Sequence, residues 1–249
     1  MTPPRSLVPP PTDATHPIWD RTRVVAREVL STLRTGLLPL ARLRALPSPD
    51  PRPELRPVVL VHGFLGHPEM FRPLTWRLLE EGFPQVVRVA YPSTRLHLEE
   101  IVEEIAARVA DLGHRRKVDL VGHSLGAVAC RAWLKAFGGA KHVERFVSLG
   151  GPHAGTSFYR LVPRPLRPAM DPRGPWVQRL SEGREPVPTV VIRARYDHQV
   201  FPPQRGAIPG AREVVLHGFG HNGLLWSPEA HDAVIQALTE ELPDDPGAA

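Results

Sequence analysis

The chain has 249 residues, 42% of them hydrophobic and 23% charged, which is typical of a globular protein with a substantial core in one large or two small domains. Its net charge of +5 comes from arginines scattered along the chain, and only 6% of residues are aromatic, so the sequence argues against a nucleic-acid-binding surface. The single cysteine, Cys130, excludes an internal disulfide, and no apolar run reaches the length that spans a bilayer.

The first 56 residues differ in composition from the rest. Residues 1–17 are rich in proline and lack the apolar core and cleavage site of a secretory signal, so we expect a disordered tail and a cytoplasmic protein. Residues 18–46 carry apolar side chains about four apart and more arginines than acids, which predicts a basic amphipathic helix. Its apolar stripe either packs on the following domain, the alternative we favour, or contacts an anionic membrane surface. The stripe consists of Val25, Val29, Leu33 and Leu37, and a proline-rich linker completes the 18–56 segment.

The next stretch combines a strand with a glycine turn. Val58–Val61 is a short apolar run typical of a strand buried in a parallel sheet, and His62-Gly63-Phe64-Leu65-Gly66 follows it directly. A backbone amide in such a turn can face an oxygen that becomes negative during a reaction, and Phe64 supplies the candidate amide. We expect His62, which precedes the glycine, to brace the turn by hydrogen bonding rather than to act as a base.

Helical and strand patterns then alternate. Residues 69–81 predict a helix, residues 86–91 a strand, and residues 98–112 an amphipathic helix capped by Ser93 or Thr94. This alternation predicts a parallel sheet with helical crossovers.

The most informative stretch joins a strand to a helix through Gly122-His-Ser-Leu-Gly126. Val118–Val121 reads as a buried strand, and the residues after Gly126 form an alanine-rich helical pattern through Lys135. A G-x-S-x-G corner in this setting is the nucleophile elbow, in which a strained turn exposes the serine and the flanking glycines avoid a clash. Ser124 is therefore the candidate nucleophile, and the amide of Leu125 is the second candidate donor to the developing oxyanion.

After a strand at 145–149 the periodicity is lost. Residues 156–188 are rich in proline, and we expect either a cap over the site or a rigid surface loop. The candidate substrate-pocket residues are Leu65, His153, Phe158 and Tyr159.

Two further strands, at 189–192 and 213–216, each precede a candidate acid–base residue. Asp197 follows the first of these strands, where a carboxylate can orient a histidine, and His221 lies in a glycine-flanked loop after the second. The rival base His217 sits at the strand end, and the rival acid Asp119 lies inside the elbow strand. Ser227 and Pro228 begin a terminal helix, and residues 243–249 form a tail.

Four blocks together resemble the small bacterial lipases and esterases of the α/β-hydrolase superfamily. They are residues 57–64, 120–126, 148–156 and 218–227, and the likeness covers about residues 57 to 242. The resemblance implies an α/β-hydrolase fold of about six mainly parallel strands with a cap insertion at 156–188. It also implies a catalytic triad of Ser124, Asp197 and His221, in the chain order of that superfamily, with Phe64 and Leu125 at the oxyanion hole.

The expected function is hydrolysis of lipid-like or medium-chain carboxylic esters through an acyl-enzyme, with no metal or other cofactor. An acyltransferase or thioesterase on the same fold is the alternative, and a non-catalytic binding protein is a third, because fold alone does not separate them. The expected partners are an acyl-ester substrate and a peripheral membrane contact through residues 18–46, with no nucleic acid.

Overall fold

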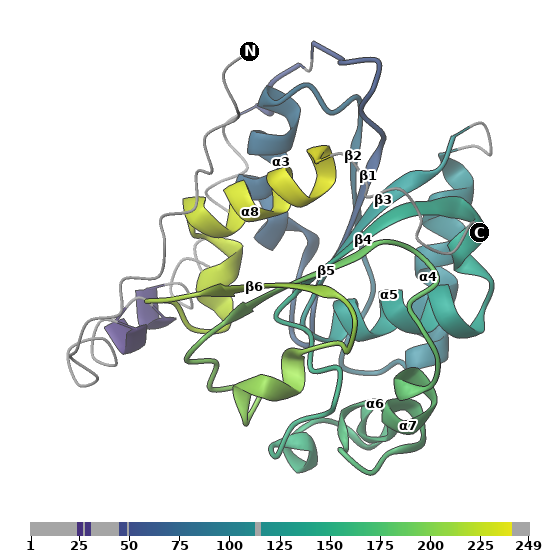
Figure 1. The fold of residues 1–249 in the computed structure, drawn as a ribbon, viewed down its shortest axis with the longest axis vertical. Coiled ribbons are helices and arrows are strands. Elements are labelled where there is room, and N and C mark those ends of the chain that lie inside the picture. The colour runs from purple at the N-terminus through teal and green to yellow at the C-terminus, as the bar shows by residue number, and fades with distance from the viewer. Residues whose placement is uncertain (1–23, 27, 31–44, 49, 113–115, 241–249) are drawn as a thin grey trace.

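The computed structural model describes residues 24–26, 28–30, 45–48, 50–112 and 116–240. At its centre is a six-stranded sheet in which every neighbouring pair is parallel (Figure 1). The strands are β1 (Val58–Val61), β2 (Val86–Val89), β3 (Val118–His123), β4 (Val143–Leu149), β5 (Thr189–Ala194) and β6 (Arg212–Leu216), in the order β2-β1-β3-β4-β5-β6. The predicted fold of about six mainly parallel strands flanked by helices is confirmed.

This strand order places a reversal of direction between β1 and β3. The chain moves outward from β1 to β2, then passes back over β1 to β3 and continues to β6. At such a reversal the loops after neighbouring strands separate, which leaves a crevice beyond the carboxyl ends of the strands. The His62–Gly66 turn after β1 and the elbow after β3 meet at this point.

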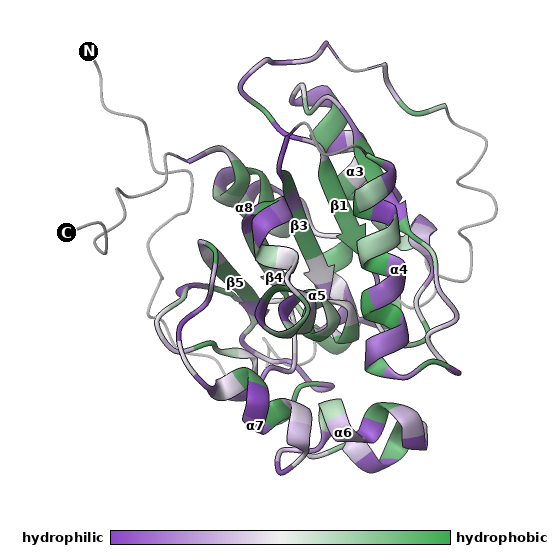
Figure 2. Ribbon diagram, turned by 90° about the vertical axis from the view of Figure 1, so that its right-hand side faces the viewer, coloured by the Kyte–Doolittle hydropathy of each residue, from purple (hydrophilic) through white to green (hydrophobic). Residues whose placement is uncertain are grey.

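Two apolar layers sandwich the sheet. On one face, α4 (Leu98–Asp111) and α5 (Leu125–Ala136) pack on Val59, Val61 and Leu120. On the other, α3 (Arg72–Glu80) and α8 (Pro228–Thr239) pack on side chains that include Leu60 and Val121. The inner strands β1 and β3 are therefore buried along their whole length, whereas the helices alternate apolar and polar sides (Figure 2).

Several helices begin where the sequence did not predict. The 69–81 pattern starts as a 3-10 turn, η1 (Pro68–Phe71), before α3. The N-cap of α4 is His97 rather than Ser93 or Thr94, because Ser93 is buried and residues 92–95 form a separate turn. The Glu100 carboxylate accepts a hydrogen bond from the His97 amide at 2.6 Å, which caps the helix instead. Ser227 caps α8 as predicted, accepting from the Ala230 amide at 3.0 Å.

The segment predicted to be irregular, residues 156–188, contains four short helical elements. They are η3 (Tyr159–Leu161), η4 (Arg164–Leu166), α6 (Arg167–Met170) and α7 (Pro175–Ser181). In the last three a proline occupies the first or second helical position, where its missing N–H costs nothing, so the prolines begin these turns. Trp176 is buried in the core and donates to the Glu99 carboxylate at 3.0 Å, which ties α7 to α4.

Only part of the predicted 18–46 helix is described. Residues 24–26 and 28–30 are helical, with Val24 and Glu28 buried against the domain. Val25 and Val29 of the predicted stripe are exposed, so the expectation that they pack on the domain is wrong. The side chains that do pack on the domain are Val24 and Glu28, each one position before a residue of the predicted stripe, and Glu28 is charged. Leu33, Leu37 and the tails at 1–17 and 243–249 lie outside the described residues, and no described helix is long and apolar enough to cross a membrane.

Candidate active site

The elbow holds Ser124 in a strained conformation between β3 and α5. Its φ is 55° and its ψ is −124°, a region that non-glycine residues rarely occupy. The Ser124 amide donates to the Leu149 carbonyl at 3.0 Å, which fixes the turn to the neighbouring strand. A Cβ on Gly122 would lie 2.5 Å from the Ala127 Cα, and one on Gly126 would lie 2.3 Å from the His62 carbonyl oxygen. Glycine is required at both places because the backbone of the elbow is packed against itself and against β1.

The turn after β1 lies against the nucleophile. A Cβ on Gly63 would stand 2.7 Å from the Ser124 Cβ and 3.3 Å from its Oγ. His62 braces this turn as expected: its Nδ1 lies 2.9 Å from the Gly63 carbonyl oxygen, and its ring stacks on Tyr91 with centroids 4.1 Å apart. The amides of Phe64 and Leu125 donate to no other described residue. Two backbone amides that donate no hydrogen bond to a described residue therefore flank the serine. One belongs to Phe64 in the turn after β1, and the other to Leu125 at the start of α5.

Asp197 and His221 form a buried pair. Asp197 follows β5 and His221 follows β6, and His221 Nδ1 lies 2.7 Å from Asp197 Oδ2. The other carboxylate oxygen accepts from the amides of Gln199 and Val200, both at 2.8 Å. These three contacts satisfy the carboxylate and fix the plane of the imidazole.

The electrostatics of the pair favour its charged form. Burial alone would raise the pKa of Asp197, but the charge and hydrogen bond of His221 and the two backbone amides hold that pKa below its ordinary value. Burial alone would likewise lower the pKa of His221. The charge and hydrogen bond of Asp197, followed by the charge of Glu28, instead raise the pKa of His221 above its ordinary value. The site thus favours a proton on His221, as a general base requires once it has taken one.

The second ring nitrogen of His221, Nε2, remains available for a proton. His221 Nε2 is buried and has no hydrogen-bond partner among the described residues. His221 also packs beside the elbow, because its ring centroid lies 4.9 Å from that of His123, the residue before Ser124. Burial lowers the pKa of His123 to about 3, so that ring stays neutral and does not compete for the proton.

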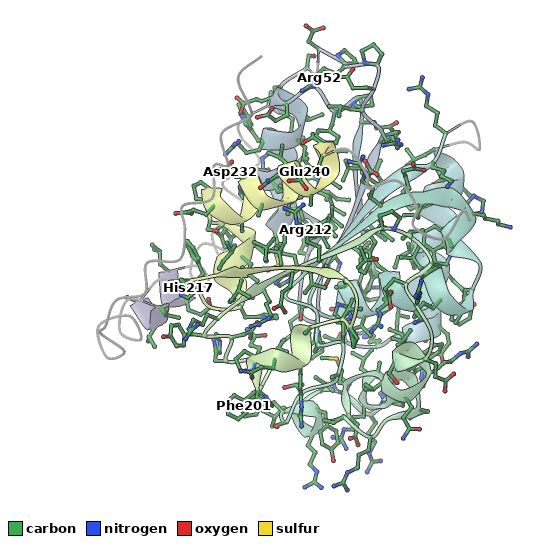
Figure 3. All side chains as sticks on the ribbon, viewed as in Figure 1. Arg52, Phe201, Arg212, His217, Asp232 and Glu240 are labelled. Carbon is green, nitrogen blue, oxygen red and sulfur yellow. The ribbon has the colours of Figure 1, made fainter. Side chains whose placement is uncertain are left out.

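The rival acid and base lie away from this pair. His217 is exposed at the outer edge of the molecule (Figure 3). Asp119 is buried five residues before Ser124, which along an extended strand is about 16 Å. Neither side chain is placed to act on the Ser124 hydroxyl.

The candidate pocket residues occupy different settings. Leu65 and Phe158 are exposed, and Tyr159 is half-buried against the core. His153 is buried, with its Nε2 2.6 Å from the Ser148 Oγ, so it holds the start of the loop after β4. Phe201, which the sequence reading missed and which is labelled in Figure 3, lies beside Phe158, with the two rings tilted and their centroids 5.9 Å apart. We call Leu65, Phe158, Leu161 and Phe201, the exposed apolar residues of these loops, the apolar rim.

Glu28 is the second residue that sequence reasoning missed. Its carboxylate accepts from the amides of Asn222 and Gly223, the two residues after His221, at 2.8 and 3.1 Å. Its separation of 194 residues from Asn222 leaves no local pattern that could have indicated the contact. Among the described residues, no group of three or more histidine, cysteine or acidic side chains is arranged to hold a metal ion.

These elements define the class of protein. A parallel sheet covered by helices on both faces, with a serine elbow after β3 and the loops after β5 and β6 beside it, is the α/β-hydrolase fold. A sequence model described as palmitoyl protein thioesterase matches residues 57–196, which is more than half of the chain. The chain therefore belongs to the palmitoyl protein thioesterase family. The match includes the turn after β1 and the elbow and ends one residue before Asp197.

Solved structures agree on the fold. The mature form of Bacillus licheniformis lipase BlEst2 superposes with a TM-score of 0.64 at 15% identity, covering 78% of this chain and 96% of that one. A monoacylglycerol lipase from Paleococcus ferrophilus gives 0.58 at 18% identity, with 78% and 96% covered. The carboxylesterase CesB from Bacillus subtilis gives 0.56 at 17% identity, with 85% and 99% covered. Together with the family match, these structures confirm the predicted resemblance to the α/β-hydrolase superfamily.

Proposed function

We propose that this protein is a serine hydrolase that cleaves esters of lipid-like acyl groups through an acyl-enzyme. The observation that carries the proposal is the buried Asp197–His221 pair, 2.7 Å apart, which leaves His221 Nε2 unpartnered beside the serine elbow. A hydrogen-bonded acid–base pair next to a strained, glycine-flanked serine is the arrangement that activates a hydroxyl nucleophile.

In the proposed reaction the Ser124 oxygen attacks the ester carbonyl carbon while His221 Nε2 takes the hydroxyl proton. The carbonyl oxygen becomes negative and accepts hydrogen bonds from the amides of Phe64 and Leu125. The tetrahedral intermediate then collapses: the bond to the leaving group breaks, and His221 returns its proton to that group. Water repeats the sequence on the acyl-enzyme, which releases the carboxylic acid and restores the serine. Asp197 keeps Nδ1 protonated and stabilises the imidazolium at each step.

Thioester hydrolysis is a second candidate, and the family match favours it. A thiol is far more acidic than an alcohol, so a thiolate leaves with less help from a protonated histidine. The same acyl group presented as an oxygen ester and as a thioester therefore distinguishes the two substrates. A larger kcat/KM for the thioester after correction for intrinsic reactivity would assign the protein to thioesters.

The first test is covalent labelling. A fluorophosphonate probe should label the wild-type protein at Ser124, and the Ser124→Ala variant should not react. We expect that variant to lose p-nitrophenyl ester turnover by at least about a thousandfold while its melting temperature stays nearly unchanged, because one hydroxyl is removed. Residual turnover above about a tenth of wild type would contradict a serine nucleophile.

A further inference from the structure

A carboxylate from the N-terminal segment is buried against the loop that carries the proposed base. Glu28 is 7% exposed, although a carboxylate is costly to bury without hydrogen-bond donors. The donors are the first two amides of η6 (Asn222–Leu225), the short turn that begins directly after His221. Charge-assisted hydrogen bonds of this kind are stronger than neutral ones. Glu28 is therefore tied to the main chain on the carboxyl side of His221.

The same carboxylate also lies against the residue before His221. A Cβ on Gly220 would stand 2.6 Å from Glu28 Oε2 and 3.0 Å from its Cδ. Because two hydrogen bonds fix this carboxylate, an added methyl group at Gly220 would displace it. Glu28 thus contacts the backbone on both sides of the base, while Asp197 holds the ring itself.

The charges around His221 come from three other elements. Asp197 after β5 and Glu28 from the N-terminal segment each favour the imidazolium, whereas His123 of β3 stays neutral and adds no charge. Glu28 also faces His198, whose Nε2 lies 3.7 Å from its Oε1 and whose side chain is 53% exposed. Two carboxylates therefore act on His221: Asp197 through a hydrogen bond and its charge, and Glu28 through its charge.

We infer that Glu28 is a positioning residue for the proposed reaction. It fixes residues 220–223 so that His221 Nε2 is presented to Ser124, and its negative charge stabilises the imidazolium that forms in the transition state. The inference rests on the proposed function, and it assigns a role in turnover to a segment that lies 30 residues before β1.

The test compares Glu28→Ala, Glu28→Gln and Glu28→Asp in the full-length protein on a soluble p-nitrophenyl butyrate substrate. For Glu28→Ala we expect kcat to fall between about 10-fold and 100-fold with KM nearly unchanged, because small misplacements of a catalytic group cost rates of this size. Glu28→Gln keeps one acceptor oxygen but turns an N–H toward the other amide, so its kcat should lie between those of wild type and Glu28→Ala.

The pH profile separates positioning from mere folding. His221 must be neutral in the free enzyme to act as a base, so kcat/KM rises with pH through its pKa. Removing the Glu28 charge lowers the pKa of His221, and the acid limb should move to lower pH in both neutral variants. Glu28→Asp retains the charge, so its limb should stay near that of wild type even where kcat is reduced.

The matched control is Glu185→Gln, which removes an equally buried carboxylate that pairs with Arg131 and Lys135 of α5. It should lower the melting temperature without moving the acid limb. Rates are expressed per active site titrated with the fluorophosphonate probe, and Glu28→Gln decides the question if Glu28→Ala does not fold.

An unchanged kcat in a folded Glu28→Gln variant, or a lower kcat with an unmoved acid limb of the pH profile, would overturn the inference. If wild type itself does not label or turn over, the proposed function fails instead.

Discussion

At the scale of single residues, kinetics can decide whether His221 or His217 is the general base. His221→Ala removes the histidine that hydrogen-bonds Asp197, so we expect its kcat to fall by three to four orders of magnitude, roughly as far as the loss of other triad bases. His217→Ala removes an exposed side chain and should leave kcat within about twofold of wild type. Steady-state kinetics on one soluble ester measures both, and a reversal of the two effects would identify His217 as the base.

Asp119 offers a prediction about stability that does not depend on catalysis. Both of its carboxylate oxygens are buried without a hydrogen-bond partner among the described residues, and burial raises its pKa to about 7 despite the opposing charges of Arg56 and Arg145. Because this pKa is raised above that of the unfolded chain, its stabilising contribution is full below about pH 4. That contribution is lost as pH rises through about 7, by ~4 kcal/mol.

Asp119→Asn should therefore remove one component of the pH dependence. The unfolding free energy of the variant minus that of wild type should increase between about pH 4 and about pH 8, measured by urea denaturation at several pH values. Taking the difference cancels every other titrating group. Asp111→Asn, at the exposed end of α4, controls for the change from Asp to Asn itself. A difference that does not vary with pH for Asp119→Asn would show that folding does not raise the pKa of this carboxyl group.

At the scale of elements, sequence reasoning succeeded where a pattern is local. Each of the six strands contains a short apolar run, and the elbow is five consecutive residues, so each signal is contained in one window. The helices of residues 156–188 were missed because elements of three to seven residues cannot show a period, and the prolines that begin them also fit a rigid surface loop. Phe201 was missed because only the fold brings it to Phe158.

The N-terminal segment shows most clearly which contacts a sequence pattern cannot predict. A spacing near four predicted correctly that residues 24–30 include helix, but it assigned the inward face to Val25 and Val29. The segment instead buries Glu28. The amides of Asn222 and Gly223, the two residues after His221, donate hydrogen bonds to its carboxylate, and these stabilise the contact more than a second apolar side chain would. No property of Glu28 in the sequence indicates those amides, since they belong to the last loop of the site.

The loops after β4 and β5 carry a prediction about substrate length. A backbone hydrogen bond of 2.9 Å joins Ser157 to Phe201, and it holds Phe158 and Phe201 of the apolar rim side by side. An acyl chain that covers this rim gains roughly 0.8 kcal/mol for each methylene that becomes fully buried. We expect kcat/KM to be larger for octanoyl than for acetyl esters, and Phe201→Ser to reduce that ratio by about three- to tenfold.

Phe137→Ser is the control for this comparison, because Phe137 has a similar exposure but lies at the end of α5, next to Trp176. It should leave the ratio of octanoyl to acetyl kcat/KM unchanged. A wild-type profile that peaks at acetate would argue against lipid-like substrates, whatever the variants do.

At the scale of the whole molecule, one segment links the surface to the active site. The helical residues 24–26 and 28–30 hold Glu28 against the loop after β6 and at the same time expose Val25, Val29 and Leu30. An exposed apolar stripe in an arginine-rich segment is typical of a helix that lies on an anionic membrane surface. We therefore propose a peripheral membrane contact through residues 18–46, of which only the described part contributes structural support. Deleting the whole segment would not test this contact cleanly, because the deletion also removes Glu28.

Paired surface substitutions test it instead. Val25→Ser with Val29→Ser changes only outward-facing side chains, so kcat/KM on soluble p-nitrophenyl butyrate should stay within about twofold of wild type. Binding to vesicles that contain phosphatidylserine should weaken by roughly thirtyfold, because each of the two valines would lose about 1 kcal/mol of partial burial. Salt should weaken binding of wild type and variant alike, since the arginines of the segment remain in both. Cosedimentation across a salt series measures these effects, with Phe137→Ser as the exposed apolar control. Unchanged vesicle binding in the double variant would mean that this stripe makes no membrane contact. If instead vesicle binding and kcat/KM on the soluble ester fall equally, the valines support the Glu28 contact rather than bind a lipid surface.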